Sequence, residues 1–142
     1  MEQKNNENRS VLRHAFFGQA SCVTLDHGQN GTFLKVGKKN GNGWGWQVAK
    51  MSMPELGDII SVLKGKTKEI SMFHSFKDKQ TKIWINRDEK GQVFFKIEDH
   101  AKPLNIGEQA VLLILLEQII EQRIKEGSND NGNAGAESAP EA

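Results

Sequence analysis

The order of secondary-structure elements constrains the fold of this chain most, because the same order is expected twice. Four short segments with the two-residue alternation of β-strands precede one segment whose apolar residues have helical spacing. This series then occurs a second time, which predicts the order ββββα–ββββα. The expected strands are residues 10–17, 20–26, 31–39, 44–51, 67–77, 81–87, 92–99 and 102–105, and the expected helices are residues 52–64 and 106–126.

Both expected helices begin with the same local signal. Ser52 with Glu55, and Asn105 with Glu108, have the spacing of a capping box, in which each side chain accepts a hydrogen bond from the other residue's amide. Gly65 follows the first helix and favours its end. These signals fix where the helical segments start and separate them from the strands.

The two halves also share a turn and a strand. In each, a glycine turn is followed by a similar strand, Phe-Leu-Lys-Val at residues 33–36 and Phe-Phe-Lys-Ile at residues 94–97. Unrelated hairpin–helix units can also share turns and caps, so both explanations stay open. We expect one α+β domain over residues 10–126, in which repeats 10–65 and 66–126 form antiparallel sheets covered by the helices.

Composition indicates a soluble protein. A length of 142 residues suits one domain. No apolar run approaches the roughly 20 residues that cross a bilayer, and the polar residues 1–9 lack the apolar stretch of a signal peptide and are expected to be disordered. Cys22 is the single cysteine, and no cysteine–histidine cluster suggests a metal. We expect a cytoplasmic protein with no membrane contact, no metal and no cofactor.

The end of the chain has its own composition. Residues 127–142 carry Asp130, Glu137 and Glu141 and no basic residue, and they have almost nothing to bury, which predicts disorder. Removing these three charges from the net +1 leaves +4 on residues 1–126. This acidic tail either keeps the chain soluble, competes with an anionic ligand or recruits a protein partner.

Alternation divides most strands into a core face and a second face of unusual composition. The core face holds Leu34, Val36, Ile70, Met72, Phe76, Ile83, Ile85, Val93, Phe95 and Ile97. The second face mixes lysines with large aromatics, where a solvated face would be polar. The face of Trp44 and Trp46 is not determined by the sequence.

Aromatics among lysines match the chemistry of unpaired nucleic acid. Exposed bases stack on aromatic rings, and lysines neutralise the phosphates between them. We therefore expect a single-stranded DNA- or RNA-binding protein without catalytic activity. The expected binding residues are Phe33, Lys35, Lys38, Lys39, Trp44, Trp46, Phe73, Lys77, Lys82, Trp84, Arg87, Phe94 and Lys96. The alternatives are a protein–protein interface on the same face, or a second core layer between two packed sheets.

Motifs for catalysis are weak. Gly65-Lys66-Thr67 resembles the end of a phosphate-binding loop, but it lacks the upstream glycine and lies between a helix and a strand, the reverse of the required order. The four histidines are isolated in sequence, and no pair of carboxylates stands out as acid and base. Of the histidines, His74 shares a strand face with core residues and is expected to be a hydrogen-bonded core histidine.

The second helix indicates an additional contact. Its apolar residues at 110–120 surround the helix on all sides, whereas a surface helix would show one stripe. Something besides its own sheet must cover it. A second copy in a homodimer formed through residues 106–126 is the simplest candidate, and the first helix of the same chain is the alternative.

Several short motifs resemble the Whirly-like group of single-strand-binding folds, which includes PUR repeats, plant Whirly proteins and positive cofactor 4. Leu25-Asp26, Asn30-Gly31 and the strand 33–36 are similar to the PUR signature, and Ile85-Asn86, Gly91 and the strand 94–97 form a looser second copy. The segment 103–113 is similar to the strand-into-helix closing of positive cofactor 4. The resemblance implies binding along the sheet, as a dimer or through two repeats in one chain, with Phe33, Lys35, Phe94 and Lys96 in the binding positions.

Overall fold

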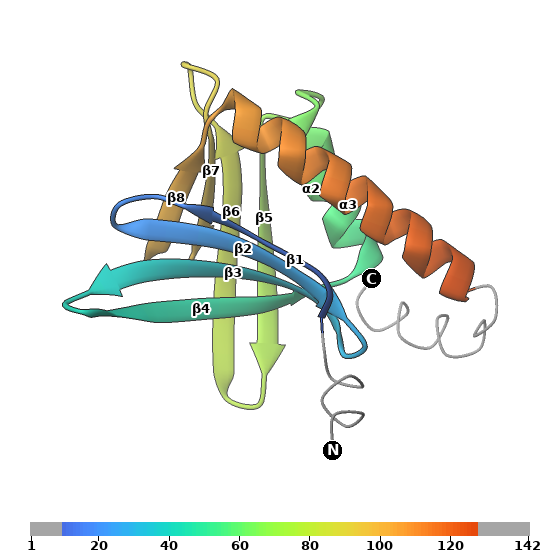
Figure 1. Ribbon diagram of the computed structural model, residues 1–142, viewed down its shortest axis with the longest axis horizontal. Helices are drawn as coiled ribbons and strands as arrows, with labels where there is room; N and C mark the ends of the chain where they lie inside the picture. The colour runs from blue at the N-terminus through green and yellow to red at the C-terminus, as the bar shows by residue number, and fades with distance from the viewer. Residues whose placement is uncertain (1–9, 128–142) are drawn as a thin grey trace.

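The computed structural model describes residues 10–127, so the predictions for residues 1–9 and for the tail beyond Gly127 lie outside the described residues. The element order is ββββα–ββββα, as the sequence predicts (Figure 1). The strands are β1 Ser10–Phe17, β2 Ser21–Gly28, β3 Gly31–Asn40, β4 Gly43–Met51, β5 Glu69–Phe76, β6 Lys79–Arg87, β7 Val93–Ile97 and β8 His100–Leu104, and the helices are α2 Met53–Leu63 and α3 Ile106–Gly127.

Each half of the chain forms its own antiparallel sheet. Strands adjacent in sequence are adjacent in space, with the orders β1-β2-β3-β4 in the first sheet and β5-β6-β7-β8 in the second. Short hairpin turns allow this arrangement, since Gly28 pairs with Gly31 and Phe76 pairs with Lys79 across two-residue turns. The expected α+β class with two antiparallel sheets is therefore confirmed.

Both predicted capping boxes are present. In α2, Ser52 N donates to Glu55 Oε1 at 2.9 Å and Glu55 N donates to Ser52 Oγ at 3.3 Å. In α3, Asn105 N donates to Glu108 Oε1 at 3.0 Å and Glu108 N donates to Asn105 Oδ1 at 2.8 Å. Each box satisfies amide groups that the first helical turn leaves without a partner. Within residues 10–127, no helix is long and apolar enough to cross a membrane.

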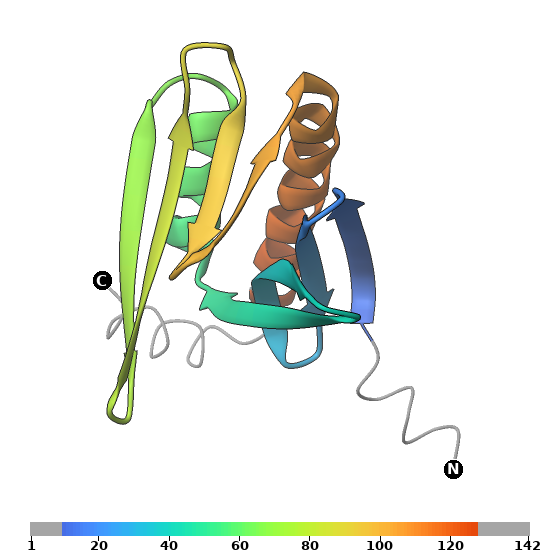
Figure 2. The same cartoon turned by 90° about the vertical axis from the view of Figure 1, so that its left-hand side faces the viewer.

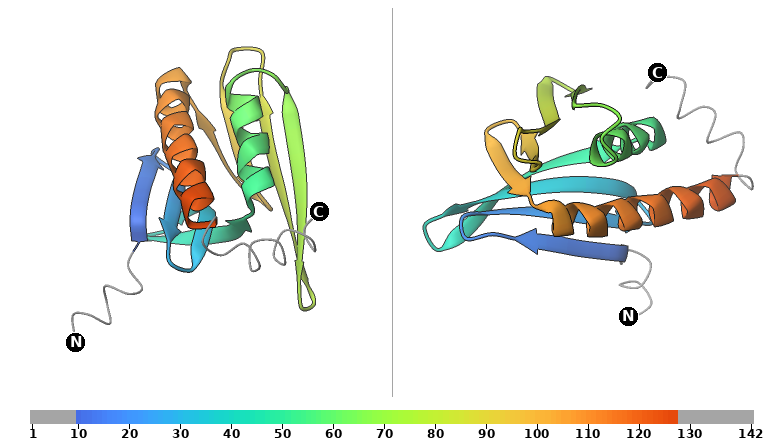
Figure 3. Two further views of the ribbon diagram at one scale, coloured as in Figure 1. Left: turned by 90° about the vertical axis from the view of Figure 1, so that its right-hand side faces the viewer. Right: turned by 90° about the horizontal axis from the view of Figure 1, so that it is seen from above.

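Each helix packs against the sheet of the other half. α2 contacts β5 and β6, and it lies along the second sheet (Figure 3). α3 leaves β8 and runs over the inner side of the first sheet, where Arg123 Nη1 donates to the Met51 carbonyl at 3.3 Å (Figures 2 and 3). Buried side chains of both sheets and both helices consequently form one hydrophobic core.

The hairpin between β5 and β6 extends past the rest of the molecule (Figures 1 and 2). Phe76 lies near its tip and is 72% exposed, so the prediction that it is a core residue is wrong. Its alternation matches that of the buried Met72, but the helices do not reach this far along the strand. His74 lies between them, half-buried, and its Nε2 is 2.6 Å from Glu55 Oε2, as expected for a hydrogen-bonded histidine.

Candidate nucleic-acid interface

The outer face of the first sheet, on the side away from the helices and the core, gathers five of the expected residues: Phe33, Lys35, Lys39, Trp44 and Trp46. The pairing of β3 with β4 shows on which face Trp44 and Trp46 lie, which the sequence alone did not determine. Cross-strand pairs lie on the same side of an antiparallel sheet. The pairs are Phe33 with Lys50, Lys35 with Val48, Gly37 with Trp46, and Lys39 with Trp44. Trp44 and Trp46 therefore share the outer face with Phe33 and Lys35. Lys38 is exposed near the end of β3, but strand alternation places it on the opposite face from these residues.

Three aromatic rings form a cluster at one end of this outer face. The rings of Trp44 and Trp46 are stacked at 6.0 Å between centroids, and Phe17 meets Trp44 edge-on at 6.3 Å. Gly37 leaves room for the Trp46 ring, because a Cβ atom at residue 37 would lie 2.8 Å from it. Phe17 and Trp46 are 67% and 41% exposed, so the cluster offers ring surface to solvent.

Phe17 is not among the binding residues expected from the sequence, because the sequence of its strand does not indicate which face it occupies. β1 has neighbouring aromatics at residues 16 and 17, and either could face the core. The register pairs Phe17 with Cys22 on the outer side, and the buried Phe16 with Val23 on the inner side. Only the pairing with β2 distinguishes the two.

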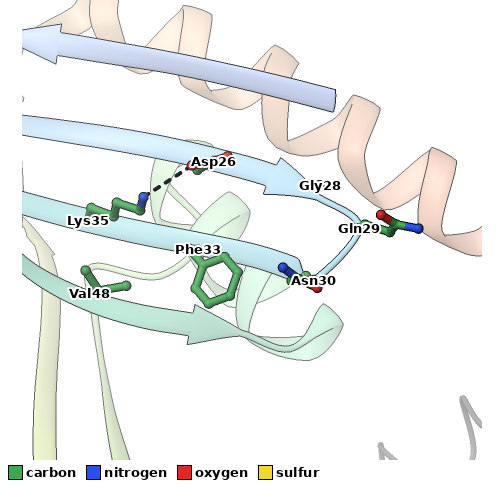
Figure 4. A pocket seen from close by; sticks show the side chains of 8 residues that line it. Asp26, Gly28, Gln29, Asn30, Phe33, Lys35 and Val48 are labelled. Carbon is green, nitrogen blue, oxygen red and sulfur yellow. Dashed lines mark hydrogen bonds and ion pairs between the residues drawn. The ribbon is translucent and has the colours of Figure 1, made fainter. Parts of the chain in front are cut away.

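A shallow pocket of about 260 Å³ lies at the other end of the outer face (Figure 4). Phe33 and Val48 supply its apolar surface, and the β2–β3 turn, residues 28–31, forms one wall. Lys35 Nζ lies 3.2 Å from Asp26 Oδ2 beside the ring. An aromatic surface next to a carboxylate and an ammonium group can stack a flat polar ring and hydrogen-bond to its edge. Asp26 was expected only as part of a turn motif, because its position beside Lys35 depends on the β2–β3 register.

The outer face of the second sheet carries a second group of aromatics and lysines. Strand pairing places Phe73 beside Lys82 and Trp84 beside Lys96. The Lys82 ammonium lies 5.8 Å from the centre of the Phe73 ring, and the Lys96 ammonium lies 5.2 Å from that of Trp84. Both distances suit cation–π contacts. Phe94 lies on the same face, half-buried, and pairs with Asn86 and Pro103.

Two expected lysines lie at hairpin ends. Lys77 occupies the β5–β6 turn with a positive φ of 56°, and its ammonium lies 5.3 Å from the Phe76 ring centre. Lys38 is close enough to Asp99 for its charge to act on that carboxyl group. The pKa of Asp99 is lowered first by a hydrogen bond with His100 and, in smaller part, by Lys38. Both lysines are exposed to solvent.

Arg87 has a different role from the predicted one. Its Nη2 donates to the Val62 and Leu63 carbonyls at 2.6 and 3.0 Å, and its Nη1 donates to the Gly91 carbonyl and to Gln109 Oε1 at 3.4 and 3.3 Å. The guanidinium therefore caps the C-terminal end of α2, where a cation also opposes the helix dipole. It points toward the core side of β6, because Arg87 has the alternation of Ile83 and Ile85. These hydrogen bonds do not support the expectation that Arg87 holds a phosphate.

The remaining expected residues do not form one continuous surface. They lie on two outer faces, and the strands of the two sheets cross (Figure 1). Among residues 10–127, no group of three or more histidine, cysteine or acidic residues could hold a metal ion. His27, on the inner side of the first sheet, accepts or donates a hydrogen bond with Thr32 Oγ1 at 2.8 Å, and burial lowers its pKa.

No protein-family model matches this sequence, and no curated protein is significantly similar to it. The similarity to the Whirly-like group consequently rests on short motifs. Any function has to be argued from the two outer faces themselves.

Proposed function

We propose that this protein binds single-stranded DNA or RNA on the outer faces of its two sheets, in the manner that its resemblance to the Whirly-like group implies. The observation that carries the proposal is that rings and lysines share the outer face of each sheet, and that on the second sheet the lysines lie over the rings. Phe73 is 52% exposed, and lysine ammonium groups lie over it and over Trp84. If the rings formed a second core layer, they would be buried beneath another sheet.

The geometry suits bases and phosphates together. An unpaired base that stacks on an exposed ring gains about 1–3 kcal/mol. A lysine already within about 6 Å of that ring has to move only a short way to reach the phosphate of the same nucleotide. The net charge of +4 on residues 1–126 adds a general attraction to a polyanion.

Single strands fit better than a duplex. Proteins that read a duplex commonly place a basic helix or ribbon in the major groove. Here the exposed sides of the helices carry acidic residues, among them Asp58 on α2 and Glu117 and Glu121 on α3. In a duplex the bases are also stacked on one another, so their faces are not free to meet the rings.

A fluorescence titration with oligo-dT at several salt concentrations tests this function. We expect quenching of tryptophan emission and an affinity that falls steeply as salt increases. Trp84→Ala should weaken binding by about 5- to 150-fold, since about 1–3 kcal/mol of stacking is lost. Ile106→Ala is the matched control, because it also removes a large exposed apolar side chain, but from the start of α3.

The same variants separate this function from a protein-interaction module. If Trp84→Ala changes the mass measured by light scattering and no variant binds oligo-dT at low salt, the outer face is a protein interface and the proposal fails. Normal mass with weakened binding supports the proposal.

We also propose that α3 contacts a second copy of the chain. Leu112, Leu116 and Ile119 are buried in the core, and α2 packs beside α3. One side of α3 is therefore covered by the first helix of the same chain, which was the alternative to a dimer. Val111 and Ile114 remain exposed one turn apart on the other side. An apolar row of this kind suits a helix pair about a twofold axis. In the light-scattering experiment, Ile114→Glu should then reduce the mass by half.

A further inference from the structure

The β2–β3 turn, which forms one wall of the pocket, lies near the last turns of α3. Arg123, in the last turns of α3, donates to the Met51 carbonyl, and the charges of Arg123 and Glu126 act on the buried His27. Met51 and His27 both pair with Thr32, directly after the β2–β3 turn. Residues after Gly127 therefore start on the inner side of the sheet, near the turn that walls the pocket, and reach the outer face by passing that turn.

Charge on the first sheet complements the sequence that follows. By strand alternation, the outer face of β1–β4 carries four cations and, among the described residues, one carboxylate, Asp26, which already lies 3.2 Å from Lys35. The cations are Arg13, Lys35, Lys39 and Lys50. Residues 128–142 carry three carboxylates and no basic residue.

The spacing of these acids covers the whole face. An extended chain advances at most about 3.3–3.6 Å per residue, so Asp130 reaches about 10 Å beyond Gly127 and Glu141 up to about 50 Å. The ten residues of β3 span about 33 Å at the usual strand rise. The segment is therefore long enough to pass the turn and follow β3, so that its acids can reach Lys35, Lys39 and Lys50.

We propose that residues 128–142 dock on the outer face of the first sheet and compete there with nucleic acid. The competition rests on the proposed function, whereas the docking does not. Exposed ion pairs are weak, but a short tether gives an effective concentration on the order of millimolar. The tail then occupies the face for a large fraction of the time at low salt and leaves it at high salt, because salt screens the pairs.

The docking is tested on the full chain by NMR, without nucleic acid. The variant Asp130→Asn/Glu137→Gln/Glu141→Gln removes the tail charges, and Asp58→Asn/Glu89→Gln/Glu121→Gln changes the net charge equally at exposed positions elsewhere. We expect the tail variant, and not the control, to shift the backbone amide signals of Phe33, Lys35 and Lys50. These differences should vanish near 1 M NaCl. Shifts confined to the substituted residues and their neighbours would overturn the proposal.

The competition is tested by titration with oligo-dT. At about 50 mM salt the tail variant should bind about two- to tenfold more tightly than the native chain, since the binding-competent fraction increases. The control variant should gain clearly less, and the difference should disappear at about 300 mM. Equal gains in both variants would overturn the competition. Amide shifts in the tail variant together with no binding by any chain would instead retain the docking and refute the proposed function.

Discussion

At the scale of single residues, the lysine–ring pairs of the second sheet suggest a role for each lysine both in the free protein and in the proposed complex with nucleic acid. The Lys96 ammonium lies over the Trp84 ring, a contact worth about 0.5–1 kcal/mol at an exposed site. Under the proposed function, a base that stacks on this ring displaces the ammonium, and the phosphate of the same nucleotide then attracts it. The free protein thereby keeps its exposed rings partly covered. Trp46 differs, because its ring stacks on that of another tryptophan, Trp44.

The role of Arg87 in the structure differs from the one expected from the sequence, and a substitution can test which role is correct. Arg87→Met removes donors to the last carbonyls of α2, so we expect a loss of about 2–4 kcal/mol in the free energy of unfolding. The protein that remains folded should bind oligo-dT normally. Lys82→Met is the control, with stability changed by about 0.5 kcal/mol or less and binding weakened. Urea unfolding and titration measure the two quantities. Unchanged stability with weakened binding in Arg87→Met would restore the phosphate role.

At the scale of elements, local sequence signals are sufficient to predict the order of the helices and strands and the face on which most side chains lie. They are not sufficient to predict which residues a side chain contacts. Both capping boxes and most core residues follow from spacing within ten residues or so. Arg87 could not be assigned from β6 alone, since the carbonyls that it caps belong to α2, more than 20 residues earlier. The pocket at Asp26 and the choice between Phe16 and Phe17 likewise depend on register between strands. The sequence did not predict that the β5–β6 hairpin protrudes, because the alternation of side chains along a strand does not reveal where the core ends.

The two sheets provide separate groups of rings, which predicts independent contributions to binding. Trp46 lies on β4 and Trp84 on β6, and the two belong to different sheets. With an oligo-dT long enough to contact both, Trp46→Ala and Trp84→Ala should each weaken binding, and the double variant should lose the sum within about 0.5 kcal/mol. With an oligonucleotide so short that it contacts one sheet at a time, each single variant should retain about half of the binding capacity. A double variant no weaker than one single variant would indicate that only one sheet binds.

At the scale of the whole molecule, each helix packs on the sheet of the other half, so the stability of each half depends on the other. The first half contains the first sheet and α2, but the helix over that sheet is α3 (Figure 2). The second half contains the second sheet and α3, while α2 packs on β5 and β6. Each half alone would expose the inner side of its sheet to water. An antiparallel sheet without cover on its apolar side is not stable in isolation.

Cutting the chain between the halves tests this dependence. Fragments 1–65 and 66–142 should each lack the near-ultraviolet circular dichroism of packed aromatics, and mixing them should restore it together with oligo-dT binding. The intact chain should unfold in urea in one transition, because both sheets share one core. Changing Arg123 to Met in the second fragment should weaken the reassembly, since its bond to the Met51 carbonyl joins the two halves. If each fragment folded alone with its own spectrum, the helices would have to cover the sheets of their own halves, and the exchanged arrangement would be wrong for the free protein.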